Sequence, residues 1–348
     1  MKKYLISPEG KFYKANLHCH TTISDGKMTP EEVKAYYKAH GYSVVAYTDH
    51  CIMIPHHDLD DEEFIALSGY ENEQLINQKE PPRRKDCHVC YISLKKDNDT
   101  MPYYLPRSIW GNGKIFKDQV KFNFDHTLET WGYGAEYTNR NIALAREQGF
   151  FVTYNHPGWS AEHYEDYSKY TGMNAMEIFN YGSWEAGYPD YVPHVYDEFL
   201  RSGKRIYAIA TDDNHSVRNS CGGWTMIKAP KFEYEAITDA LVRGDFYASF
   251  GPEIHELWIE GNEVHVTCSD AKRVICSFPD RRCLMANKKD GQPITEAVFV
   301  VDPTDTYFRI TVVDENDRCA DTNAYFTDKL PLEKNLISGA DRCVRPFC

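Results

Sequence analysis

Residues 44–50 read Val-Val-Ala-Tyr-Thr-Asp-His, a short apolar run that ends in a carboxylate and an imidazole. Such a run is typical of a buried strand, and the polar pair at its end is where a sheet can present a site. The pattern recurs along the first 250 residues, and each predicted strand delivers a candidate ligand: residues 14–18 deliver His18, residues 64–68 lead to Glu71, residues 150–154 lead to His156, and residues 205–210 lead to Asp213 and His215.

Helix signals alternate with these strands. Thr29 and Pro30, followed by two glutamates, predict a helix start that has Thr29 as N-cap. Further helices are expected over residues 139–148, 191–202 and 234–243. Alternation of strand and helix indicates the α/β class with a parallel sheet. Ligands from five or six different strands favour a (β/α) barrel, because a doubly wound sheet would concentrate its site at one switch point.

Two regions depart from this rhythm. Residues 95–136 are rich in Tyr, Trp, Pro and Gly and form an insertion. It is either a lid or binding loop, or a surface elaboration or oligomer contact. After residue 252, short strand signals with tight turns predict a small β-sandwich. We therefore expect a domain over residues 1–252 and a β-sandwich-like domain over residues 253–348.

The composition excludes some classes. The 348 residues carry a formal net charge of −13, which argues against general nucleic-acid binding. The sequence shows no signal peptide and no apolar run of membrane-spanning length, so we expect a cytoplasmic protein with reduced thiols. Cys87 and Cys90 form a C-x-x-C around His88. We interpret both as small residues of a buried strand, with a redox or zinc pair as the alternative.

Nine side chains at predicted strand ends are candidate metal ligands. Imidazoles and carboxylates bind Zn, Mn or Fe, and about nine of them would serve two or three divalent ions, with Glu71 placed to bridge. The candidates are His18, His20, Asp25, His50, Glu71, His88, His156, Asp213 and His215.

The order of these motifs resembles the polymerase and histidinol phosphatase (PHP) family over residues 14 to about 250. The motifs are H-x-H, a following aspartate, T-D-H, a glutamate, a histidine, H-P and D-x-H. The resemblance implies a distorted seven-stranded (β/α) barrel with two or three metals at the strand C-termini. It implies one ion held by His18, His20 and Asp213 with Glu71 bridging, a second by Glu71, His88 and His156, and a third by Asp25, His50 and His215. The C-terminal β region is similar to that of carbaryl-hydrolase-like members.

Further residues have weaker signals. Asp49 and Asp212 are next to ligands, and Glu177 lies on a strand, so each is expected to orient an imidazole or to be a structural acid. Arg83 and Arg84 could bind an anionic substrate, and His56 and His57 could bind substrate or donate a proton; a surface role is the alternative for all four.

The sequence thus predicts a metal-dependent hydrolase that activates water between two or three divalent ions, most simply a phosphoesterase acting on a small anionic substrate such as a nucleotide or sugar phosphate. A carbamate or carboxyl ester hydrolase is the first alternative, and a non-catalytic metal- or carbohydrate-binding module is the second. A proofreading exonuclease is disfavoured by the acidic charge and the lack of a polymerase segment. The sequence leaves the oligomeric state open, and a homo-oligomer is one alternative.

Overall fold

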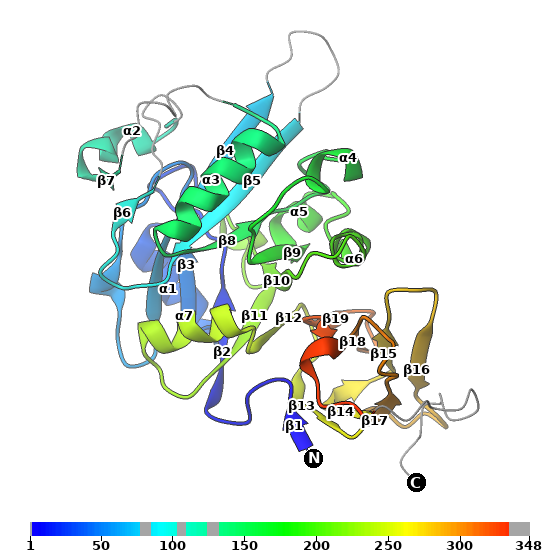
Figure 1. The fold of residues 1–348 in the computed structure, drawn as a ribbon. Helices are drawn as coiled ribbons and strands as arrows, with labels where there is room; N and C mark the ends of the chain where they lie inside the picture. The colour runs from blue at the N-terminus through cyan, green and yellow to red at the C-terminus, as the bar shows by residue number, and fades with distance from the viewer. Residues whose placement is uncertain (1, 77–84, 103–108, 124–131, 334–348) are drawn as a thin grey trace.

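The computed structural model describes residues 2–76, 85–102, 109–123 and 132–333. Most of the strands in this part of the chain belong to one mixed sheet, in the order β10-β9-β8-β5-β4-β3-β2-β11-β12-β19-β18-β15-β16 (Figure 1). The first nine strands of this order are β10 (Tyr207–Thr211), β9 (Ala175–Asn180), β8 (Phe150–Tyr154), β5 (Lys85–Ser93), β4 (Ile65–Ile76), β3 (Val44–Tyr47), β2 (Lys11–Asn16), β11 (Trp224–Ala229) and β12 (Phe246–Ser249).

The expected α/β class is confirmed, but the sheet is not purely parallel. β10, β9 and β8 are parallel neighbours, as are β4, β3 and β2. The pairs β4·β5, β5·β8, β2·β11 and β11·β12 are antiparallel. Within the described residues β10 and β2 share no strand ladder; their continuations meet at an isolated parallel bridge between Cys19 and Asn214. The seven-stranded barrel therefore stays a prediction.

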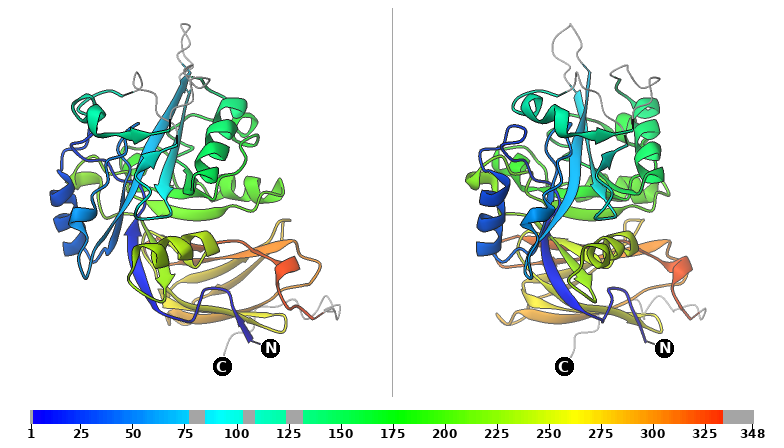
Figure 2. Two further views of the ribbon diagram at one scale, coloured as in Figure 1. Left: turned by 60° about the vertical axis from the view of Figure 1, so that its left-hand side comes forward. Right: turned by 90° about the vertical axis from the view of Figure 1, so that its left-hand side faces the viewer.

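Helices pack on the outside of this sheet (Figures 1 and 2). α1 (Pro30–Ala39) begins as predicted: the Thr29 hydroxyl accepts from the Glu32 backbone N–H, and the Glu32 carboxylate accepts from the Thr29 N–H. The other described α-helices are α2 (Gly113–Phe116), α3 (Ala135–Glu147), α4 (Tyr164–Tyr167), α5 (Tyr181–Glu185), α6 (Pro193–Arg201) and α7 (Tyr234–Arg243). None of the helices in the described ranges has both the length and the apolar character needed to cross a membrane.

The C-terminal strands, together with the N-terminal strand β1, pack as two sheets at one end of the molecule (Figure 2). One sheet has the order β1-β13-β14-β17, and the remaining strands extend the large sheet through the antiparallel pair β12·β19. A single apolar cluster, including Ile259, Val264, Phe308 and Ile310, contains residues from both sheets. These strands are β1 (Lys2–Tyr4), β13 (Ile254–Glu260), β14 (Glu263–Ala271), β15 (Arg273–Ser277), β16 (Cys283–Asn287), β17 (Ile294–Val300), β18 (Tyr307–Val313), β19 (Cys319–Thr322) and β20 (Tyr325–Phe326).

Part of the 95–136 insertion is described. It contains the two-stranded pair β6 (Thr100–Met101) and β7 (Lys121–Phe122), together with α2. Gly111 and Asn112 approach the loop after β2, where the Asn112 N–H donates to the Ser24 carbonyl. The insertion therefore reaches the part of the chain that carries the first candidate ligands.

Candidate metal centre

The nine candidate ligands come together at one end of the sheet. Seven of them lie in loops that follow strands, as expected: His18, His20 and Asp25 after β2, His50 after β3, His156 after β8, and Asp213 and His215 after β10. Glu71 and His88 lie inside β4 and β5, so the expectation of strand ends is wrong for these two.

The reason is that β4 and β5 form a long antiparallel pair that continues past the site. Gly69 looks like the end of a strand in the sequence, but the chain stays extended through it. A Cβ at Gly69 would lie 2.7 Å from the Tyr91 carbonyl oxygen, so the glycine allows β5 to approach closely. Because alternate residues of a strand share a face, Glu71 and Glu73 both point to the site.

The inner part of the cluster is fully buried. The Nε2 atoms of His18 and His20 lie only 3.0 Å apart. Asp213 Oδ1 lies 3.3 Å from the first and 3.1 Å from the second of these nitrogens, and Glu71 Oε1 lies 3.2 Å from the first. Glu71 Oε1 is also 3.3 Å from His156 Nε2 and 3.2 Å from His88 Nδ1. Glu71 is therefore the carboxylate that joins these groups.

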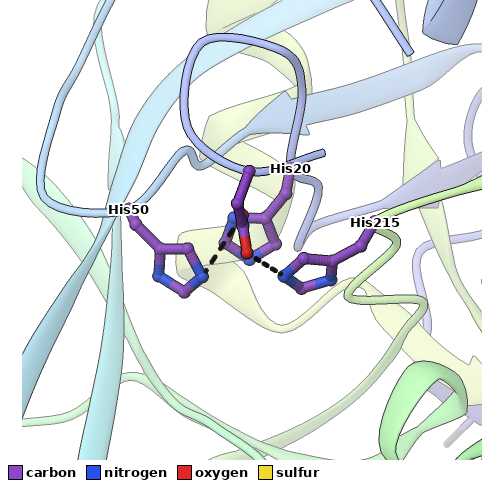
Figure 3. A group of neighbouring side chains, drawn as sticks. His20, His50 and His215 are labelled. Carbon is purple, nitrogen blue, oxygen red and sulfur yellow. Dashed lines mark ion pairs between the residues drawn. The ribbon is translucent and has the colours of Figure 1, made fainter. Parts of the chain in front are cut away.

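The outer part is shown in Figure 3, where the rings of His20, His50 and His215 surround one space. The ring centroids of His50 and His215 lie 4.1 and 4.3 Å from that of His20. Asp25 completes the group, 3.7 Å from His50 Nε2 and 3.4 Å from His215 Nε2.

The structure groups the ligands somewhat differently from the resemblance. His20 belongs both to a group with His18 and Asp213 and to the outer group with Asp25, His50 and His215. A third group contains His50, Glu71 and His88.

Hydrogen bonds outside the cluster fix which nitrogen carries the proton. His18 Nδ1 lies 2.7 Å from Glu177 Oε1, and His215 Nδ1 lies 3.1 Å from the Asp213 carbonyl oxygen. Because both of these oxygens only accept, each Nδ1 carries a hydrogen, which leaves Nε2 as the nitrogen that can bind a cation. This is the arrangement that a metal-binding histidine requires.

The electrostatics fit a set of bound cations. Burial alone would raise the pKa of Glu71, but the imidazoles of His88 and His18 hold it well below its ordinary value. Burial, with His50 and His215 nearby, lowers the pKa of His20 to about 3, so this imidazole is neutral. His20 Nδ1 and His88 Nδ1 are buried and make no hydrogen bond, whereas His50 Nδ1 lies 2.6 Å from Glu73 Oε1 and 3.0 Å from Glu71 Oε2. Converging imidazole nitrogens and ionised carboxylates are what divalent cations satisfy.

Glu177 supports the cluster from β9. Its Oε1 accepts from His18 Nδ1 and, at 2.6 Å, from the Thr211 hydroxyl. Its Oε2 accepts from the His156 backbone N–H and from Asn180 Nδ2, both at 2.8 Å. His156 has a positive φ of 26°, and Glu177 therefore anchors both an imidazole and a strained backbone position.

Asp49 and Asp212 were expected either to orient an imidazole or to be structural acids, and their described hydrogen bonds are those of structural acids, with none to a histidine of the cluster. Asp49 accepts from the backbone and hydroxyl groups of Thr21 and Ser24, which shapes the loop carrying Asp25. Asp212 accepts from the Tyr37 hydroxyl and from three backbone N–H groups of residues 221–223. Burial raises the pKa of Asp212 to about 6.

Of the four candidate substrate residues, His56 and His57 are described, and neither lies at the cavity. His56 packs against Tyr47, and His57 lies 3.2 Å from the Ser68 hydroxyl, and neither lines the cavity over the cluster. His57 is the first residue of η1 (His57–Leu59), which packs against β4. Arg83 and Arg84 lie outside the described residues.

A cavity of about 680 Å³ opens over the cluster. Trp110, from the insertion, stacks near His50 and donates to Glu73 Oε1 at 2.9 Å. Trp159 lies against His88 and His156, with ring centroids 5.0 and 4.9 Å away. No lysine or arginine is among the described residues that line the cavity.

Three residues around the site were not identified from the sequence. Glu73 could have been found, since it lies two residues after Glu71 and shares its strand face. Asn155, which donates to Glu71 Oε1 at 2.8 Å, lies next to His156. Asp190, which accepts from the Gly158 and Trp159 N–H groups, has no local signal, because only the fold brings it there.

Comparisons with known proteins give distant matches. No protein-family model matches the chain, and no curated protein matches it. Among solved structures, a two-domain protein from Bacteroides vulgatus, described as containing a predicted PHP-like metal-dependent phosphoesterase, is 16% identical, covers 92% of this chain and 97% of its own, and has a TM-score of 0.43.

Two further structures match a smaller part of the chain. A protein from Bifidobacterium adolescentis, described as a candidate metal-dependent phosphoesterase, is 14% identical over 60% of this chain and 89% of its own, with a TM-score of 0.37. The lesion-specific endonuclease EndoQ from Pyrococcus furiosus is 12% identical over 66% of this chain and 56% of its own, with a TM-score of 0.38.

Proposed function

We propose that the chain is a metal-dependent hydrolase of the PHP type that cleaves a small phosphate ester. One observation carries the proposal: His18 Nε2 and His20 Nε2 lie 3.0 Å apart, with ionised Asp213 and Glu71 beside them. Two imidazole nitrogens and two carboxylates that converge this closely in a buried site are a ligand set that suits a divalent cation.

The proposed ligands are the nine residues named above, holding two or three ions of Zn, Mn or Fe. When bound, such ions lower the pKa of coordinated water and offset charge on the ester oxygens. Glu71 stays ionised because its imidazole neighbours hold its pKa low, so it serves as a bridging acceptor and not as a proton donor. Glu177 holds His18 in the Nδ1–H tautomer throughout.

For the fold, we propose that the strands from β10 to β2 correspond to the seven-stranded PHP barrel. We also propose that residues 253–348 form a β-sandwich-like domain that follows a 1–252 catalytic domain. The apolar cluster shared by the two C-terminal sheets supports the second proposal.

A carbamate or carboxyl ester hydrolase is the second candidate. The observation that favours it is the described cavity lining, which has two tryptophans and the acids Glu73 and Asp86 but no lysine or arginine. Such a lining suits a neutral or aromatic ester better than a doubly charged phosphate.

The test begins with elemental analysis of the purified protein, for which about two or three ions per chain are expected. Mn- and Zn-loaded protein is then assayed on nucleotide and sugar phosphates and, in parallel, on carbamate and carboxyl esters. His18→Ala should abolish turnover, and His56→Ala, a histidine outside the cluster, should retain it.

Turnover of carbamate or carboxyl esters alone would replace the phosphate proposal with the second candidate. Bound metal without any turnover would indicate a binding module. Full activity in His18→Ala would overturn the metal assignment.

A further inference from the structure

The two cysteines of the C-x-x-C motif lie in different environments. Cys87 and Cys90 are both fully buried in β5, as expected for small residues of a buried strand. Because they are three positions apart along the strand, they point to opposite faces of it. Cys87 belongs to the large apolar cluster that also contains Tyr154 and Tyr170. Cys90 belongs to none of the apolar clusters of the described chain.

Cys90 instead faces the metal centre. It shares its strand face with His88 and pairs in register with Glu71. Cys90 Sγ, a ring nitrogen of His18 and a carboxylate oxygen of Glu71 all lie within 4.8 Å of one another. Asn155 Nδ2 donates to Cys90 Sγ at 3.1 Å and to Glu71 Oε1 at 2.8 Å, so one amide holds both groups in place.

A second, independent observation points to a cation at this position. Glu71 is fully buried, and its Oε1 lies 3.2 Å from both His18 Nε2 and His88 Nδ1 and 3.3 Å from His156 Nε2. His88 Nδ1, on the same face of β5 as Cys90, is buried without a hydrogen bond. A buried lone pair without a donor is a group that a bound cation can satisfy.

We propose that Cys90 is a sulfur ligand of the cation shared by His18 and Glu71, and that it makes this centre selective for thiophilic divalent ions. Zn–S bonds of about 2.3 Å and Zn–N or Zn–O bonds of about 2.0–2.2 Å place two ligands of one ion within about 4.4 Å, so only a small side-chain adjustment is needed. Binding forms one sulfur–metal bond, breaks the S–H bond and releases that proton to solvent.

The selectivity follows from ligand chemistry. Thiolate prefers Zn²⁺ and Fe²⁺, and carboxylate and water suit Mn²⁺ and Mg²⁺. The proposal rests on the metal centre of the proposed function, but it does not depend on the substrate. It assigns Cys90 a role that neither the H-x-H nor the D-x-H motif contains.

The test is an anaerobic Co²⁺ titration of the full-length protein after its metal has been removed with a chelator. Bound Co²⁺ gives visible ligand-field bands, and a sulfur ligand adds a charge-transfer band in the near ultraviolet. The matched variants are Cys90→Ala and Cys87→Ala, two buried cysteines of the same strand on opposite faces. The sulfur band should be present in the wild type, absent in Cys90→Ala and retained in Cys87→Ala.

Competition titrations with Zn²⁺ and Mn²⁺ measure how much Cys90 contributes to the affinity for each ion. Zn²⁺ affinity should fall at least about tenfold in Cys90→Ala, and Mn²⁺ affinity should change less. If Cys90→Ala does not fold, zinc-edge X-ray absorption of the wild-type protein decides, because a bound sulfur scatters at about 2.3 Å.

Two results overturn the proposal while leaving the metal centre in place: ligand-field bands without a sulfur band in the wild type, or a sulfur band that survives in Cys90→Ala. Absence of both kinds of band, with no ion found by elemental analysis, overturns the proposed metal centre together with the Cys90 assignment.

Discussion

Replacing Glu177 with glutamine should weaken metal binding by changing the tautomer of His18. Glu177 accepts four hydrogen bonds, two at each oxygen. A glutamine must put an NH₂ group on one side. On the Oε2 side it would meet the His156 backbone N–H, which cannot accept, and the Asn180 NH₂ group. Asn180 cannot turn over freely, because its Oδ1 accepts from the Ser183 N–H at 2.9 Å.

The NH₂ group is therefore expected on the Oε1 side, facing Thr211 and His18. The Thr211 hydroxyl can rotate and accept. His18 can accept only by moving its hydrogen from Nδ1 to Nε2, which removes the lone pair that faces His20 and Asp213. Loss of such a supporting group lowers metal affinity by about 10–100-fold. Each tenfold step corresponds to about 1.4 kcal/mol.

The assay is competition for Zn²⁺ against a chromophoric chelator, with urea unfolding of the metal-free protein measured alongside. Glu162→Gln is the matched control, because Glu162 is also a buried glutamate, and it accepts from Tyr133, Tyr154 and Tyr170 without contacting the cluster. Both variants should lose some stability, but only Glu177→Gln should lose Zn²⁺ affinity. Equal Zn²⁺ affinity in the two variants would refute the tautomer argument.

Three further predictions follow from the same geometry. Chelation should lower the melting temperature, since ligand at about 100 times its Kd stabilises by about 2.7 kcal/mol, and differential scanning calorimetry that finds no shift would count against a metal centre. Burial raises the pKa of Glu162, so the folded state keeps this proton to higher pH than the unfolded chain. The stability of the metal-free protein should therefore fall as pH rises from the ordinary glutamate value through the raised pKa, and urea titrations should show a smaller fall in Glu162→Gln. Trp110→Ala and Trp159→Ala should raise KM more for aryl esters than for methyl esters, and equal changes for both esters would argue against ring stacking in the cavity.

The sequence predicts the position of seven of the nine candidate ligands because these seven follow strands. The loops after β2, β3, β8 and β10 carry their polar residues at short, fixed distances from apolar runs, and parallel strands bring those loops to one edge. The antiparallel β4·β5 pair breaks this rule, since Glu71 and His88 lie within the strands. Whether two strands pair parallel or antiparallel depends on how the chain connects them. No sequence pattern near Glu71 or His88 indicates this direction.

The support around the ligands is less predictable, for a physical reason. Asp49 and Asp212 are next to candidate ligands in the sequence, but the loops around them supply backbone N–H groups, and each carboxylate binds those amides instead. Glu177 lies far from His18 in the sequence and reaches it across the sheet. Proximity along the chain therefore selects ligands well and selects their supporting groups poorly.

The alternation of strand faces also explains why one half of the C-x-x-C motif has a different role from the other. Strand periodicity requires Cys87 and Cys90 to face opposite sides, so they cannot act as a redox pair or hold one ion together. Once His88 is placed at the centre, the same periodicity brings Cys90 to it, since the two residues are two positions apart. If Cys90 binds the ion with His18 and Glu71, the preference for zinc or iron originates in β5, and the outer group of His20, Asp25, His50 and His215, which contains no sulfur, can take a harder ion such as Mn²⁺.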